Sequence, residues 1–234
     1  MTKRQKANME IAEKGKEAHS IQHAVQLLKT YPATKFDQTV EIAIHLSIDP
    51  RQADQQLRGS VSMPKGVGRS ARVICFCPTD KEEAAKTAGA IEAGSEALVK
   101  KIEGGWLDFD VAIASPDMMR FVGKLGRQLG PKGLMPSPKA GTVTPDIETA
   151  VADFAAGKVE YRNDDGGNIH CIVGKMSFSE EDLIENLNFF VNLISKARPA
   201  AVKGEYIKNC SISGTMTPSV KVEAQTTVTK GVKQ

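Results

Sequence analysis

Acidic residues are absent from one long stretch of this 234-residue chain. No Asp or Glu occurs in residues 118–145, and the cations there include Arg127, Lys132 and Lys139. Residues 125–144 also contain four glycines and three prolines. Glycine loses much chain entropy on folding and proline removes a backbone donor, so both weaken helices and strands. We therefore predict a surface loop, neither a long helix nor a central strand, whose cations are available to an anionic partner.

A large excess of charge is also lacking. The formal net charge is +3 and the sequence pI is about 8.6. This excess is too small for a chain that coats nucleic acid indiscriminately, so any polyanion-binding surface is expected to be local. No apolar run is long enough for a signal peptide or a membrane span, which predicts a cytoplasmic protein without a membrane partner.

Aromatic residues and cysteines are few. Only 5% of residues are aromatic, which favours an aliphatic, layered core. The four cysteines do not have the spacing of metal ligands, and we expect them to be small buried apolar residues in a reducing compartment. They are Cys75, Cys77, Cys171 and Cys210.

The motifs of nucleotide-binding sites and of enzymes are missing as well. The glycines of residues 126–133 are not followed by the Lys-Ser or Lys-Thr of a phosphate loop, and the prolines conflict with a dinucleotide fingerprint. Residues 130–133 have only the bare GxxG form of a KH loop. His19 and His23 have no third metal ligand nearby, and the turn around Asp164 and Asp165 explains both carboxylates without a substrate. We expect no metal, no cofactor and no catalysis.

The pattern of apolar and polar residues changes twice along the chain. Residues 39–49 alternate between apolar and polar side chains, which is typical of a half-buried antiparallel strand. Beyond Gly66, short apolar strands alternate with helices, and Glu82 and Glu83 stand where capping-box partners would stand. After Lys158 the alternating pattern typical of antiparallel strands returns. The residues thus predict an α+β domain, built from 1–66 and 159–234, interrupted by an inserted α/β domain at 67–158.

Two apolar residues stand where no core face is obvious. Phe36 lies between Lys35 and Asp37 just outside the alternating strand, and Met216 lies between Thr215 and Thr217 in a predicted turn. A ring or thioether beside hydroxyls and lysines is a suitable platform for the sugars and bases of a nucleic acid. The alternative is that both side chains plug the ends of a sheet, and their spacing does not decide between the two.

Several segments together resemble the bacterial ribosomal protein L1 family, the protein of the mobile lateral stalk of the large ribosomal subunit. The resemblance runs in order from about residue 3 to residue 228. It is carried by LGRQLGPKGLMPSPKAGTVT, TKFDQTVE, LSIDPRQADQQLRG, EYRND, IHCIVGK and TMTPSVKV.

The resemblance implies a two-domain fold whose inserted domain is Rossmann-like and whose interrupted domain carries the main ribosomal RNA site. It implies binding of stalk RNA, assistance to the release of exit-site transfer RNA, repression of the chain's own operon messenger RNA, and no enzymatic activity. Carried over residue by residue, the RNA contacts fall on Lys35, Phe36, Thr39, Glu41, His170, Lys175, Thr215, Met216 and Thr217.

One residue departs from the family's pattern. Thr217 stands where the family has glycine after the Thr-Met pair, which adds a side chain where backbone and RNA are expected to come close. The resemblance also changes the expected role of Arg127, Lys132 and Lys139, which become a secondary basic surface facing ribosomal or transfer RNA. Two alternatives stay open: a messenger repressor acting mainly off the ribosome, and a nucleotide-dependent enzyme using residues 67–158.

Overall fold

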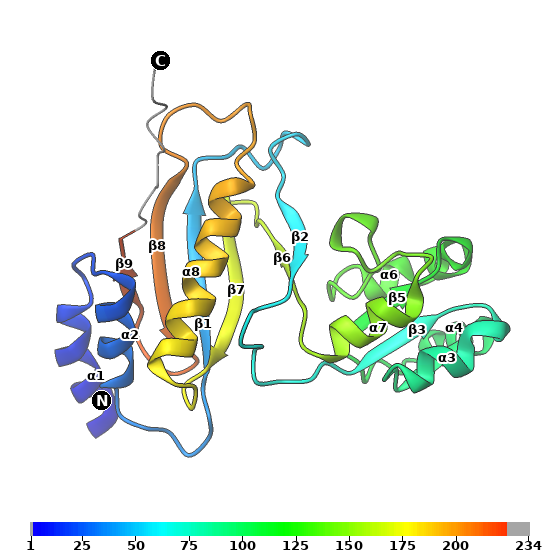
Figure 1. Cartoon of the computed structure of the whole chain (residues 1–234), viewed down its shortest axis with the longest axis horizontal. Coiled ribbons are helices and arrows are strands. Elements are labelled where there is room, and N and C mark those ends of the chain that lie inside the picture. The colour runs from blue at the N-terminus through cyan, green and yellow to red at the C-terminus, as the bar shows by residue number, and fades with distance from the viewer. Residues whose placement is uncertain (1, 224–234) are drawn as a thin grey trace. The chain divides into compact units, whose positions relative to one another are not determined.

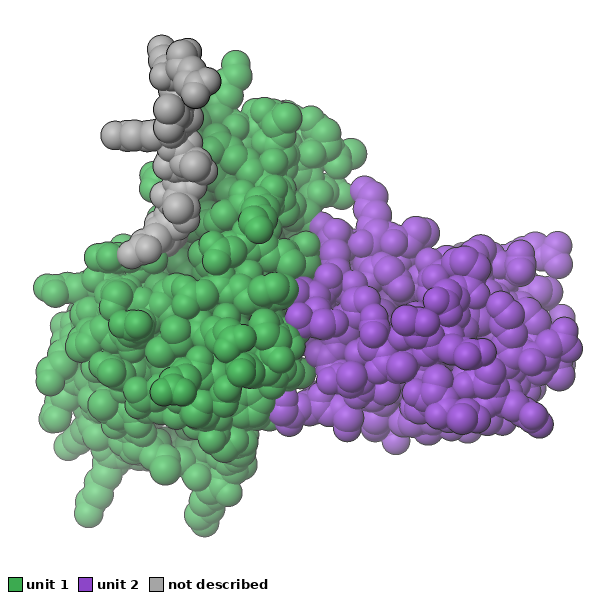
Figure 2. Space-filling view, in the orientation of Figure 1, with its two compact units in different colours: residues 1–57, 63–67, 161–234 green, residues 58–62, 68–160 purple. Residues whose placement is uncertain are grey.

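A computed structural model describes residues 2–223 of the chain. The chain divides into two compact units, coloured green and purple in Figure 2. Unit 1 comprises residues 1–57, 63–67 and 161–234, and unit 2 comprises residues 58–62 and 68–160. The residues beyond 223, including the basic segment at 229–234, lie outside the described range.

The core of unit 1 is a four-stranded antiparallel sheet with the order β7-β1-β8-β9 (Figure 1). Two helices, α2 and α8, pack against one face of this sheet. A further helix, α1, precedes them. The strands are β1 (Thr39–Leu46), β7 (Asn168–Lys175), β8 (Ile207–Gly214) and β9 (Val220–Val222), and the helices are α1 (Lys3–Lys14), α2 (Ile21–Lys29) and α8 (Glu180–Lys196).

Alternation along β1 determines which face of the sheet is buried. Val40, Ile42, Ile44 and Leu46 are each at most 1% exposed, and they face the two helices. Burying these aliphatic side chains contributes about 1.5–3 kcal/mol each, which is why the register of β1 is strongly specified. The predicted half-buried strand is confirmed.

The opposite face of the sheet is polar. Glu41 is exposed there and pairs across the sheet with Ile172 of β7 and Ser213 of β8. One step further along, Ala43 pairs with His170 and with Ser211. These side chains are partly or fully exposed, so this face has donors and acceptors that the core does not use.

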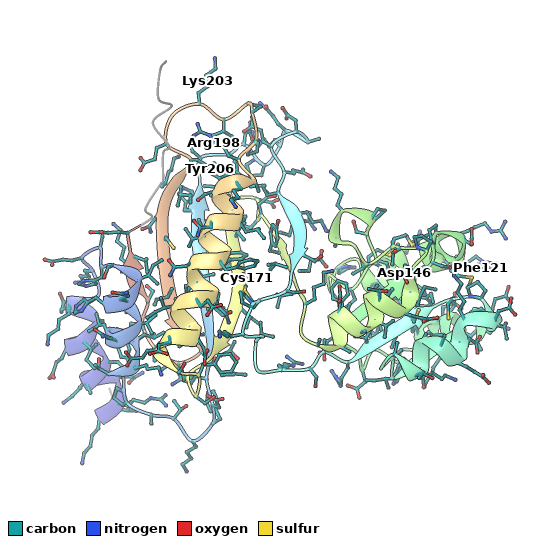
Figure 3. The ribbon with its side chains drawn as sticks, viewed as in Figure 1. Phe121, Asp146, Cys171, Arg198, Lys203 and Tyr206 are labelled. Atoms are coloured by element: carbon teal, nitrogen blue, oxygen red, sulfur yellow. The ribbon has the colours of Figure 1, made fainter. Side chains whose placement is uncertain are left out.

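One end of the unit 1 sheet is closed by a stacked pair. The Arg198 guanidinium lies 5.9 Å from the ring centre of Tyr206, close to the end of α8 (Figure 3). Arg198 also donates to the carbonyls of Val202 and Gly204, each at 2.9 Å. Burial raises the pKa of Tyr206 to about 12, because it disfavours the charged phenolate.

Unit 2 is built on three parallel strands in the order β4-β3-β5. Apolar clusters lie on both sides of this small sheet, one including α4 and the other including α7. The elements are β3 (Val73–Phe76), η1 (Thr79–Lys81), α3 (Glu82–Thr87), β4 (Glu92–Gly94), α4 (Glu96–Glu103), β5 (Val111–Ala114), η2 (Pro116–Met118), α5 (Met119–Val122), η3 (Gly123–Leu125), α6 (Gly126–Leu129), η4 (Pro138–Ala140) and α7 (Ile147–Ala155).

The fold predictions have mixed outcomes. The combination of helices and sheets is confirmed, whereas the domain boundaries and the Rossmann-like character of the middle segment stay predictions. The predicted capping box is wrong, because a 3-10 turn precedes α3 and no side chain caps its first turn. Two further strands, β2 (Arg58–Val61) and β6 (Val159–Arg162), form a separate two-stranded sheet.

The cysteines are free and buried, as expected. Burial raises the pKa of Cys171 to about 12 and that of Cys210 to about 12, and it raises the pKa of Cys75 and Cys77 as well. A thiol held neutral by burial is a poor nucleophile and a poor metal ligand. These four side chains therefore serve packing.

An ion-pair cluster holds the start of β3 in unit 2. The Asp110 carboxylate accepts from Arg69 at 2.9 Å and from the Arg72 Nε at 3.0 Å. These contacts, led by the hydrogen bond from Arg72, lower the pKa of Asp110 from 3.8 to about 2. Arg72 also contacts Asp108, whose side chain is 75% exposed.

The lowered pKa predicts a stability loss in acid. Because the folded pKa of Asp110 lies below the unfolded value, its stabilising contribution is fully present above about pH 4 and is lost as the pH falls toward 2. Urea unfolding from pH 5 downward should show the gap between the wild type and Asp110→Asn closing. Asp108→Asn is the control, with little effect at any of these pH values. A gap for Asp110→Asn that stays constant with pH would contradict the assignment.

Candidate nucleic-acid interface

The tight turn between β8 and β9 presents Met216 at the surface of unit 1. Gly214 and Thr217 close this turn, since the Thr217 N–H donates to the Gly214 carbonyl at 3.1 Å. We call residues 214–217 the Met216 turn. The Met216 side chain is 48% exposed.

The loop before β1, residues 31–38, presents the second apolar side chain. Phe36 is 52% exposed, and we call this segment the Phe36 loop. The hydroxyl of Thr34 donates to the Phe36 carbonyl at 2.6 Å, and the Asp37 carboxylate accepts from both the N–H and the hydroxyl of Ser177. The loop is therefore braced internally at Phe36 and attached to Ser177 through Asp37.

Hydrogen bonds join the Phe36 loop and the start of β1 to the Met216 turn. The Thr215 N–H donates to the Thr39 carbonyl, and the Thr39 N–H donates to the Thr215 hydroxyl, both at 3.1 Å. The Lys175 ammonium donates to the Thr39 hydroxyl at 2.8 Å. Segments that are far apart in the sequence thus meet at one end of the sheet.

The predicted RNA contacts therefore form one group and two outlying positions. Phe36, Met216 and the hydrogen-bonded residues Thr39, Lys175, Thr215 and Thr217 gather at the start of β1, with Lys35 exposed in the adjoining loop. Glu41 is exposed one step along the open sheet face. His170 is exposed opposite Ala43, which lies about 13 Å along β1 from Thr39 at the usual rise of a strand.

The exposure of Phe36 and Met216 bears on the two interpretations of their role. Phe36 is 52% exposed and Met216 is 48% exposed, so about half of each residue is accessible to a partner. Phe36 also forms one wall of a shallow cavity of about 310 Å³, which Tyr31, Gln38 and Met176 help to line. An exposed ring on a fixed loop is the arrangement that a stacking platform requires.

Thr217 folds back onto its own turn. Its hydroxyl accepts from the Gly214 N–H at 2.8 Å, and the side chain is only partly exposed. Gly214 accommodates it, because a Cβ at that position would lie 3.0 Å from the Thr217 hydroxyl oxygen. The Thr217 side chain thereby helps to close the turn.

The predicted secondary basic surface lies in unit 2. Arg127, Lys132 and Lys139 are all exposed, and the segment that carries them consists of short helical turns and loops anchored by Leu125 and Leu129, each at most 1% exposed. Nearby, the cations of Arg120 and Lys124 lie 5.0 Å and 6.0 Å from the ring centre of Phe121. Figure 3 marks Phe121 among the helices of this unit.

Sequence reasoning missed two residues that hold the Met216 turn. They are Gln38 and Asn8, whose side-chain amides contact the main chain of Met216. The sequence does mark Gln38. It lies two residues before Val40, and so has the spacing of the buried apolar residues of β1, where a polar residue is unexpected. Nothing in the sequence around Asn8 marks it.

The described residues contain neither a candidate metal site nor a candidate membrane-spanning helix. Residues 2–223 contain no group of three or more His, Cys, Asp or Glu side chains that could hold a metal ion. No helix in the same range is long and apolar enough to cross a membrane.

Comparison with known proteins identifies the family. A model of the ribosomal protein L1p/L10e family matches residues 28–218, a range that includes every predicted contact residue in both units. The chain belongs to this family.

Two relatives of this chain show how far the similarity extends. Both are named large ribosomal subunit protein uL1, and they come from the strains ATCC BAA-365 and ATCC 11842 of Lactobacillus delbrueckii subsp. bulgaricus. Each is 49% identical over 225 residues, covering 95% of this chain and 97% of the relative. The resemblance inferred from the sequence is thus confirmed, and so is the expected location at the cytoplasmic ribosome. Members of the family are structural ribosomal proteins rather than enzymes.

The inward-turned Thr217 predicts a specific loss of stability. Thr217→Ala removes the acceptor of the Gly214 N–H, which should lower the free energy of unfolding by about 0.5–1.5 kcal/mol in urea denaturation. Thr217→Ser keeps the hydroxyl and should unfold nearly as the wild type does. Equal losses in the two variants would show that the hydroxyl does not close the turn.

Proposed function

We propose that the chain is a structural component of the large ribosomal subunit that binds the ribosomal RNA of the lateral stalk. The contact surface consists of the Phe36 loop, the Met216 turn and the adjoining open face of the unit 1 sheet. The observation that carries this proposal is the half-exposure of Phe36 and Met216 on segments fixed by hydrogen bonds.

The chemistry of this surface suits RNA. An exposed ring and an exposed thioether pack against bases and sugars, and the Thr215 hydroxyl is a partner for a ribose 2′-OH. Lys35 and Lys175 supply positive charge for phosphates on the same side of the unit. Glu41 and His170 extend the surface along the sheet with groups that can accept or donate hydrogen bonds.

The remaining functions in this proposal are those that the resemblance to the family implies. The chain assists the release of exit-site transfer RNA, with Arg127, Lys132 and Lys139 supplying charge contacts to ribosomal or transfer RNA. It also represses translation of its own operon messenger RNA, which would carry a structure similar to the stalk RNA. One surface in unit 1 serves both RNAs, so the ratio of the two affinities distinguishes a ribosomal protein from a regulator acting mainly off the ribosome.

Removing the Met216 side chain should weaken stalk RNA binding. Met216→Ala should raise the dissociation constant by a factor that corresponds to about 1–3 kcal/mol, because a side chain packed on a base contributes on that scale. Filter binding to stalk RNA across a series of salt concentrations measures both the affinity and its salt slope. The slope should be negative, from counterion release, and Met216→Ala should leave it unchanged.

A matched control comes from another exposed apolar residue of unit 1. Phe189 on α8 is 40% exposed but lies outside the proposed surface, so Phe189→Ala should bind stalk RNA as the wild type does. Two results would refute the proposal: equal affinity of the wild type for stalk RNA and for an unrelated hairpin, or an unchanged dissociation constant in a folded Met216→Ala variant.

A further inference from the structure

The main chain of Met216 is held on both sides by buried side-chain amides. The Met216 N–H donates to the Gln38 Oε1 at 2.9 Å, and its carbonyl accepts from the Asn8 Nδ2 at 3.4 Å. Gln38 is 3% exposed and Asn8 is 8% exposed, so both amides are removed from solvent. A turn exposed at the surface is thus held from beneath.

The two amides come from elements that are themselves anchored. The Gln38 carbonyl accepts from the Met176 N–H at 2.9 Å, which fixes the residue at the end of the sheet. Asn8 lies in the middle of α1, and the helix is tied to β9 because the Lys221 N–H donates to the Gly15 carbonyl at 3.0 Å. Both amides are therefore held in place to contact the Met216 main chain.

Stability alone does not explain these residues well. Among the described residues the Asn8 Oδ1 is buried without a hydrogen-bond partner, and an unsatisfied buried polar atom is destabilising. Gln38 is buried directly before β1, in step with the buried positions of that strand, which are aliphatic. Burying an amide at either position carries a desolvation cost that an apolar side chain would not have.

We propose that Gln38 and Asn8 are positioning residues for RNA binding, which hold the Met216 peptide so that its side chain meets RNA in one orientation. This inference rests on the proposed function of the Met216 turn. A contact that is already ordered in the free protein does not lose that conformational freedom on binding, which strengthens affinity without any new contact to the ligand.

The mechanism differs from a charge contact in a measurable way. Neither amide carries charge and neither is placed against RNA, so their removal should leave the salt slope of binding unchanged. It should weaken binding only as long as Met216 has a side chain to orient. A general loss of fold would instead weaken binding whether or not that side chain is present.

The test is a double-mutant cycle on the full chain with stalk RNA. Gln38→Met keeps the length of the side chain and removes the acceptor, and it should weaken binding roughly three- to tenfold, the effect of re-ordering one flexible side chain and its turn. In a Met216→Ala background the same substitution should change the dissociation constant by less than about twofold. Thermal melting of each variant should show a transition no more than slightly below that of the wild type.

Asn8→Leu is the second arm of the test. Asn8 lies on α1 and contacts the Met216 carbonyl, whereas Gln38 contacts the Met216 N–H. Asn8→Leu should reproduce the pattern of Gln38→Met: weaker binding in the wild-type background, little change beside Met216→Ala, and an unchanged salt slope. This arm decides the outcome if Gln38→Met does not fold.

Two results overturn the inference. One is wild-type affinity in a folded Gln38→Met or Asn8→Leu variant, and the other is an equal loss with and without the Met216 side chain. The proposed function fails separately, since its failure is an unchanged dissociation constant for Met216→Ala alone.

Discussion

The alternation of β1 is the constraint on which unit 1 depends. Its aliphatic residues direct one face of the sheet toward α2 and α8, and because the side-chain period is two, a slip of one residue would turn the whole set toward solvent. β1 also pairs with strands on both sides, so its first residues lie beside the end of β8. The position of Thr39 therefore determines where the Phe36 loop and the Met216 turn meet.

Family membership and local geometry both support the proposal that the Phe36 loop and the Met216 turn contact RNA. The family match includes the whole of both segments, while the hydrogen bonds explain how this particular sequence holds them. Thr217 illustrates the difference. The family match does not describe this side chain, whereas the bond between its hydroxyl and the Gly214 N–H shows that it closes its own turn. Local hydrogen bonding thus holds the turn that presents Met216.

Much of this arrangement could be predicted from the sequence, and the failures have identifiable causes. Strict alternation fixed β1, and continuous apolar runs fixed β3 and β5. The three-residue strand β4 was missed because its period is too short to detect, and the capping box failed because the chain enters α3 through a 3-10 turn. The sequence could not show that Phe36 is exposed, since its exposure depends on distant residues that fold against its loop, such as Met176 and Ser177. The role of Asn8 could not be predicted for the same reason, because its partner, the Met216 carbonyl, lies 208 residues away in the sequence.

The central claim is that the Met216 turn is already ordered before RNA arrives. Amide hydrogen exchange in the free, full-length protein tests it most directly at the Met216 N–H, which lies in an exposed turn but donates to the buried Gln38 Oε1. The account predicts that this amide exchanges at least about tenfold more slowly than an unprotected amide in the same sequence context. Exchange at the unprotected rate in the free protein, with protection appearing only when RNA is bound, would contradict it.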